Sequence, residues 1–122
     1  MRLMLKWNTT MNANTHFTGV MNNTKWEELR LAMLSLGSLS PQFQIKDVMS
    51  DQPSAWDGEW YYHFRLLPYS TIEWCDLRVR HEEQRREIRQ ILYAIHLPGE
   101  ATEEGFRIYG WIQNGAVVNY LK

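Results

Sequence analysis

The chain is poor in cysteine and in long apolar runs, and each shortage excludes a class of protein. Cys75 is its one cysteine, so a disulfide within the chain is impossible and a reducing compartment is expected. No apolar run approaches the roughly 18 residues of a membrane-spanning helix, and Leu3–Leu5 is too short for the ~7–15-residue apolar part of a secretion signal. The sequence therefore predicts a cytoplasmic protein with no membrane association.

An excess of positive charge is also missing. Thirteen Lys and Arg stand against 14 Asp and Glu, for a formal net charge of −1, so no overall field attracts the chain to nucleic acid. It has no glycine-rich phosphate-binding loop and no Gly-x-Ser-x-Gly motif of the kind found in many hydrolases. No histidine pair has metal-ligand spacing with cysteines. We predict no catalytic residue, no cofactor and no metal.

Large aromatic side chains, by contrast, are abundant. The sequence holds six Trp, six Tyr and four Phe. A single core of this size rarely hides so many large rings, so we expect some to be partly exposed. Exposed aromatic rings with polar tips are enriched where proteins contact one another.

The first part of the chain differs from the rest. Residues 1–20 contain an Asn- and Thr-rich run with little periodicity, which predicts a loop-like N-terminal extension or a short edge strand. Residues 21–122 are predicted to form a single domain, and Met21 is an alternative natural start to Met1.

Two segments have the pattern of amphipathic helices. Thr24 and Glu27 have the spacing of a capping box, and apolar residues then recur every three or four positions, which predicts a helix over 24–36 that ends at Gly37. The second helix is expected over 81–95, where an apolar stripe lies opposite charged residues.

Alternating apolar residues predict strands. An Asn-Gly pair, typical of a tight type I′ turn, joins the last two into a hairpin. The resulting fold class is α+β: a mostly antiparallel sheet of about five strands with two helices packed on one face, in the order α-β-β-β-α-β-β. The predicted strands are 42–48, 59–66, 71–77, 106–112 and 116–121.

The register of the second and third strands places two polar residues together. If Trp60, Tyr62, Phe64 and Leu66 share a core face with Ile72 and Trp74, then His63 lies directly opposite Glu73 on the other face. A cross-strand His–Glu pair is usually structural, but it could also be an oriented general base.

The sheet face away from the helices is the main candidate site. Two helices cover only one face of such a sheet, so the other face is expected to be open and rich in aromatic rings. The alternatives are that the N-terminal segment, the loop carrying Trp56 or a second copy of the chain covers it. The candidate binding residues on this face are Tyr61, His63, Glu73, Tyr109, Trp111 and Tyr120.

Charged residues offer two weaker candidates. Acidic residues in two loops could attract a basic partner, although ordinary solvated loop charge is the favoured explanation. Arginines near the second helix could contact RNA, but glutamates lie between them, which favours a salt-bridged exposed face. The acidic residues are Asp51, Asp57, Glu59, Glu100, Glu103 and Glu104, and the arginines are Arg78, Arg80, Arg85, Arg86 and Arg89.

Several short motifs resemble a family of small bacterial domains of unknown function. They are Thr24-Lys25-Trp26, Asp57-Gly58-Glu59-Trp60-Tyr61-Tyr62-His63-Phe64, Ile72-Glu73-Trp74, Pro98-Gly99-Glu100, Thr102-Glu103 and Gly105-Phe106-Arg107-Ile108-Tyr109-Gly110. The resemblance covers about three-quarters of the chain, from Met21 to Gly110, and leaves residues 1–20 outside. It implies a bacterial origin and Met21 as the domain start, and it implies no activity or catalytic residues.

Together these observations favour a non-catalytic protein-binding domain. Its partner would be another protein, or a second copy of the chain in a homodimer, and its size and acidic loops suggest an immunity protein or antitoxin by analogy. A small-ligand-binding protein or enzyme using His63 and Glu73 is the second hypothesis. An RNA-associated module is the third, and binding to nucleic acid is not favoured.

Overall fold

A computed structural model describes residues 16–121 of the chain. Between the strands and helices lie three short 3-10 helices, at Gly37–Leu39, His63–Arg65 and Tyr69–Thr71. In chain order the strands and helices are β1 (Phe17–Gly19), α3 (Asn23–Leu34), β2 (Gln42–Asp47), β3 (Ile72–Arg78), α4 (Glu82–Ile95), β4 (Gly99–Ala101), β5 (Gly105–Tyr109) and β6 (Trp111–Gln113).

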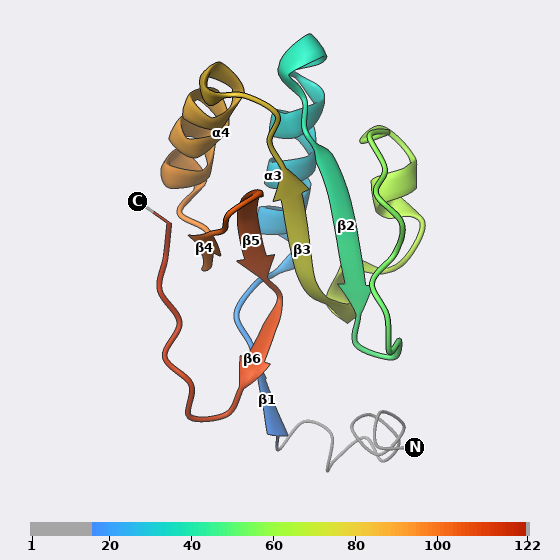
Figure 1. Ribbon diagram of the computed structural model, residues 1–122. Coiled ribbons are helices and arrows are strands. Elements are labelled where there is room, and N and C mark those ends of the chain that lie inside the picture. The colour runs from blue at the N-terminus through green and yellow to red at the C-terminus, as the bar shows by residue number, and fades with distance from the viewer. Residues whose placement is uncertain (1–15, 122) are drawn as a thin grey trace.

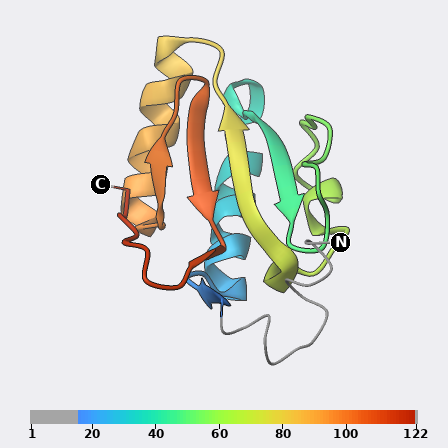
Figure 2. The same ribbon diagram turned by 60° about the horizontal axis from the view of Figure 1, so that its bottom comes forward.

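One antiparallel sheet organises the fold. Its strand order is β2-β3-β5-β4, and β1 pairs with β6 in a separate two-stranded sheet. Helices α3 and α4 lie behind the same face of the four-stranded sheet, and the opposite face carries neither helix (Figures 1 and 2). The predicted α+β class, with a mostly antiparallel sheet and two helices on one face, is confirmed.

The core lies between this sheet and the two helices. Successive side chains of a strand point to opposite faces, and Cys75, which is paired with Ile45 and Ile108 in the register, points toward the helices. Fully burying one large apolar side chain contributes about 1.5–3 kcal/mol. The largest buried side chains include Trp26, Leu29, Met33, Trp60, Phe64, Leu77, Ile88, Leu92, Phe106 and Ile108.

Both helices form near their predicted positions, but the expected capping box is wrong. Helix α3 begins one residue earlier than predicted, because the side chain of Asn22 accepts the hydrogen bond from the Lys25 N–H at 2.8 Å. Thr24 therefore lies inside the helix. The carboxylate of Glu27 is not directed back to the helix start and instead pairs with Arg30 at 2.6 Å.

The predicted strand over 59–66 is wrong. These residues form turns and the 3-10 helix His63–Arg65, and β3 pairs with β2 and β5 instead. Only Trp60 and Phe64 are buried, four residues apart, whereas Tyr62 and Leu66 are exposed. A spacing of four fits a helical turn better than a strand, so the apolar alternation was misleading here.

Trp74 lies on the face of the sheet opposite to the predicted one. A β-bulge between Lys46 and Asp47 shifts the register of β2 and β3. A bulge turns the following side chains toward the other face. Ile72 and Cys75 consequently point into the core, and Trp74 lies on the open face of the sheet beside Arg107.

The predicted C-terminal hairpin is also wrong. The turn at Asn114-Gly115 forms, with Gly115 at φ +86°, but residues 116–121 do not pair with β6. Strand β6 pairs with β1 instead, and β5 has β3 and β4 on its two sides. Residues 116–121 run along β4, where Leu121 is buried in the core (Figure 1).

Candidate functional site

The structure separates the predicted site residues into three places. Glu73, Tyr109 and Trp111 line one groove on the open sheet face. Tyr61 and His63 lie in the segment that replaces the predicted second strand. The sixth residue, Tyr120, stacks on the imidazole of His96 at a centroid distance of 4.8 Å.

The groove on the sheet face has a volume of about 750 Å³ and lies between β3, β5, β6 and residues 116–119. Glu73 pairs with Lys46 at 3.0 Å, and the Tyr109 hydroxyl donates to the Glu100 carboxylate at 2.8 Å. Burial and this hydrogen bond raise the pKa of Tyr109. The indole N–H of Trp111 donates to the Ser70 carbonyl at 3.0 Å, so polar groups in this groove already have partners.

The centre of the open face is a network of paired charges. Arg107 donates to both carboxylate oxygens of Asp76, at 2.7 and 2.9 Å, and lies 3.8 Å from the centroid of the Trp74 ring. The hydrogen bond that Arg107 donates to the Asp76 carboxylate raises the pKa of Arg107, so this guanidinium stays charged. The guanidinium of Arg78 lies 4.3 Å from the centroid of the Trp56 ring, so this loop tryptophan packs against an arginine.

Two of the arginines near the second helix, Arg80 and Arg85, are similarly engaged. Arg80 donates to the Ser38 carbonyl at 3.1 Å, and Arg85 donates to the Glu103 carbonyl at 3.4 Å while facing the Phe106 ring. Side chains already bonded within the fold are poorly placed to track a phosphate backbone.

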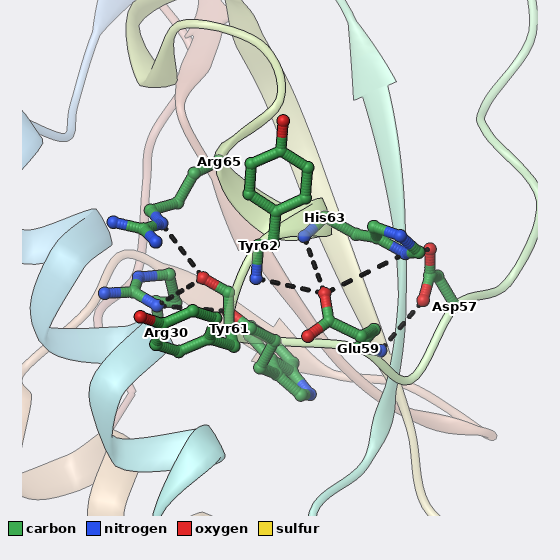
Figure 3. Close-up of polar contacts among 8 residues, drawn as sticks. Arg30, Asp57, Glu59, Tyr61, Tyr62, His63 and Arg65 are labelled. Atoms are coloured by element: carbon green, nitrogen blue, oxygen red, sulfur yellow. Dashed lines mark hydrogen bonds and ion pairs between the residues drawn. The ribbon is translucent and has the colours of Figure 1, made fainter.

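Residues 59–67, which we call the aromatic turn, form the second region. Carboxylates and a guanidinium hold its backbone, in place of a strand ladder (Figure 3). One oxygen of Glu59 accepts from the N–H groups of Tyr62 and His63, at 3.0 and 2.8 Å. From the opposite side Arg30 donates to the carbonyls of Trp60 and Tyr61, at 3.2 and 2.9 Å.

His63 is oriented by Asp57, and the predicted pairing with Glu73 does not form. The Nδ1 atom of His63 lies 2.8 Å from a carboxylate oxygen of Asp57, whereas Glu73 pairs with Lys46 on the sheet face. Burial raises the pKa of Asp57, but hydrogen bonds from the Glu59 N–H and from His63 outweigh burial and lower it overall. Hydrogen bonds from the His63 and Tyr62 N–H groups lower the pKa of Glu59 as well. Both acids therefore stay ionised near neutral pH.

The aromatic turn exposes large side chains although its backbone is fixed. Between the buried rings of Trp60 and Phe64, Tyr61 is 61% exposed and Tyr62 is 59% exposed. Leu66 and Leu67 follow, at 58% and 57%. Sequence reasoning selected Tyr61 and His63 here but missed Tyr62 and the two leucines. The spacing of four between Trp60 and Phe64 is the signal that could have found them.

A pocket of about 720 Å³ lies between the aromatic turn, β2 and the loop before the turn. Phe43, Ile45 and Phe64 contribute to its apolar wall, and Asp57 and His63 belong to its polar part. Because its lining is mostly apolar with a few polar groups, it has the composition of a small-molecule site.

Other chemistry has little support in the part of the chain that the structure describes. No three His, Cys, Asp or Glu side chains among residues 16–121 lie together as metal ligands. None of the helices in this range combines the length and the apolar character needed to cross a membrane. Burial raises the pKa of the Cys75 thiol well above its ordinary value, which makes a reactive thiolate there unfavourable.

Comparison with known proteins supports the expected type of family. Neither a curated protein nor a solved structure matches the chain significantly. One family model matches residues 8–115 and therefore includes residues 8–20, which the resemblance from sequence motifs had left outside. Strand β1 and both helices lie within this match, and residues 116–121 along β4 lie beyond it. The chain belongs to the Family of unknown function (DUF6678).

Proposed function

We propose that this chain is a non-catalytic protein-binding domain and that the aromatic turn is its contact surface. The observation that carries the proposal is the exposure of Tyr61, Tyr62, Leu66 and Leu67, each more than half exposed, within one segment of nine residues. Exposed apolar side chains gathered in one place mark interaction sites more often than isolated ones do. Tyrosine is also among the residues that contribute most to binding energy at interfaces.

The fixed backbone of the aromatic turn supports the same proposal. Arg30 and Glu59 each hold two backbone groups of the turn. Binding through a segment that is already ordered avoids the entropic cost of ordering it. Exposed tyrosines on an ordered backbone are therefore suited to binding a partner protein.

The partner that we propose is a different protein, and the sheet-face groove is not part of the surface. Glu73, Tyr109 and Trp111 line that groove. Asp57 precedes the aromatic turn, Glu59 is its first residue, and both carboxylates remain ionised. Their charge favours a partner with basic side chains around its apolar contact. An immunity protein or antitoxin of the bacterial cytoplasm is the role that we propose for such a domain, by analogy of size and acidic loops.

A site-specific photocrosslink tests this proposal. The full chain would carry p-benzoylphenylalanine in place of Tyr62, and the control would carry it in place of Tyr93, which is 41% exposed on α4. We expect a crosslinked protein at position 62 only. With the purified partner, Tyr61→Ala and Tyr62→Ala should each weaken binding about tenfold or more, and Tyr93→Ala should leave it unchanged.

Two results would contradict the proposal. One is equal crosslinking at positions 62 and 93, which would indicate unspecific contact. The other is a crosslinked product that consists only of two copies of this chain, which would identify the turn as a homodimer interface.

A further inference from the structure

The pocket beside the aromatic turn has the size and lining of a ligand site. Its volume of about 720 Å³ lies within the roughly 300–1,000 Å³ typical of small-molecule pockets. Phe43, Phe64 and Ile72 are themselves buried, so the base of the pocket is part of the folded core. A ligand there would meet a preformed apolar surface.

The carboxylates of the pocket carry negative charge, and His63, which pairs with Asp57, is positive in its protonated form. Asp47 and Asp57 belong to its lining, and none of the lining residues among 16–121 is a Lys or Arg. Asp47 accepts from the Thr71 hydroxyl and from the Met49 N–H, each at 2.8 Å, which fixes its carboxylate. An anionic ligand would be repelled here, and a cationic one would be attracted.

His63 adds a directed hydrogen-bond acceptor. Its Nδ1 atom faces the Asp57 carboxylate, so in the neutral ring Nδ1 carries the proton and donates it to Asp57. The Nε2 atom is then an acceptor, because a neutral imidazole has one donor and one acceptor nitrogen. A ligand N–H group is the complementary partner.

We propose that this pocket binds a small apolar molecule that carries an amine. Its apolar body packs against Ile45, Phe64 and Ile72, and its protonated amine lies near Asp57 and the Nε2 atom of His63. This site goes beyond the proposed protein contact, although Leu66 and Leu67 belong to both the pocket and the exposed surface. Ligand and protein partner would therefore influence each other through these leucines.

Matched small probes test the charge preference. Phenethylamine and phenylacetate share a benzyl body and differ in the sign of their charge. In a 15N-resolved NMR titration of the full chain, phenethylamine should cause saturable shifts at residues lining the pocket, with a dissociation constant of about 1 mM or tighter. Phenylacetate should bind at least about tenfold more weakly, as expected for a like-charge pocket.

Two variants locate the binding. Ala55 lines the pocket and is exposed, so Ala55→Trp should fill the pocket and abolish the phenethylamine shifts without unfolding the chain. Ala94→Trp, at an exposed position of α4, is the matched control and should change nothing. Asp57→Asn keeps an acceptor for the Glu59 N–H and removes the charge, so it should weaken binding about fivefold or more, and Asp51→Asn is its control.

The proposal is overturned by any of three results. These are the absence of saturable phenethylamine shifts, equal affinity for phenylacetate, and binding that survives Ala55→Trp. None of them depends on the crosslinking at Tyr62, so the ligand site and the protein contact can fail separately.

Discussion

The guanidinium of Arg30 connects helix α3 to the aromatic turn. The residue is only 4% exposed, and it donates to the Trp60 and Tyr61 carbonyls and to both oxygens of Glu27. The Tyr69 hydroxyl donates to Glu27 as well, at 2.6 Å. A buried charge is tolerated only when it is paired in this way, so this network determines where the turn lies.

Replacing Arg30 should destabilise the chain markedly. In Arg30→Met the two carbonyls of the turn lose their donor and Glu27 loses its cationic partner, which we expect to cost about 2–4 kcal/mol of unfolding free energy. Chemical denaturation followed by tryptophan fluorescence measures the loss. Glu28→Gln on the exposed side of the same helix is the control, and an equal loss in both variants would contradict the role assigned to Arg30.

Glu27 makes stability dependent on acid pH. The hydrogen bonds from Arg30 and Tyr69 lower its pKa from 4.5 to about 2. Because the folded state holds the proton more weakly, this contribution to stability is present above pH 4.5 and is lost as pH falls toward 2. Glu27→Gln should therefore flatten the decline of the urea midpoint in that range. If the variant declines as steeply as the natural chain, Glu27 is not a source of the acid sensitivity.

The aromatic turn shows why a repeating pattern can mislead. Alternation over 59–66 predicted a strand, but the backbone donors of Tyr62 and His63 are satisfied by the nearby carboxylate of Glu59. Arg30, which is far away in the sequence, supplies the donors for the turn carbonyls. The pattern of apolar residues contains no information about such partners.

Glu59 can be tested through the exchange of these amides. Glu59→Ala removes the acceptor, so hydrogen–deuterium exchange at the Tyr62 and His63 amides should become several-fold faster. Exchange at the Cys75 amide, in the middle of β3, should not change, and Glu59→Gln should behave nearly like the natural chain. Unchanged exchange at Tyr62 would mean that another group holds the turn.

The helices and β2 were predictable because their periodicity is long and agrees with their burial. The bounds of β3 were predictable too, although its bulge changes which of its side chains are buried. Helix α4 spans 82–95 against the predicted 81–95, and β2 spans 42–47 against 42–48. The site was only partly predictable. Glu73, Tyr109 and Trp111 do line one groove, but a bulge places the half-buried Trp74 on the open face of the sheet. The pairing of Asp57 with His63 depends on the path of a loop, which periodicity does not describe.

Both edges of the four-stranded sheet are covered by irregular segments of the same chain. Phe43 of β2 exchanges two backbone hydrogen bonds with Asp57, at 2.7 and 2.9 Å. On the other edge Gly99 donates to the Asn119 carbonyl, and Leu121 donates to the Leu97 carbonyl. Covered edges prevent strands of other chains from adding to the sheet.

Removal of the C-terminal segment should uncover the β4 edge. A chain ending at Gly115 loses the buried side chain of Leu121 and both hydrogen bonds, which we expect to cost about 3 kcal/mol of unfolding free energy. The open edge should also make the shortened chain self-associate. Denaturation and sedimentation velocity measure the two effects. Val117→Ser, at a position that is 88% exposed, should show neither effect, and a monomeric, fully stable shortened chain would contradict this role.

Trp60 and Phe64 lie inside the core, and Tyr61 and Tyr62 between them face outward. The buried rings that stabilise the fold and the exposed tyrosines of the aromatic turn are therefore immediate neighbours in the sequence. A substitution that changes the volume around Trp60 would rotate the neighbouring tyrosines without touching them. For the proposed protein contact, natural variation in the interior of this domain would then be a route to altered binding, even in homologues whose outward-facing residues are identical.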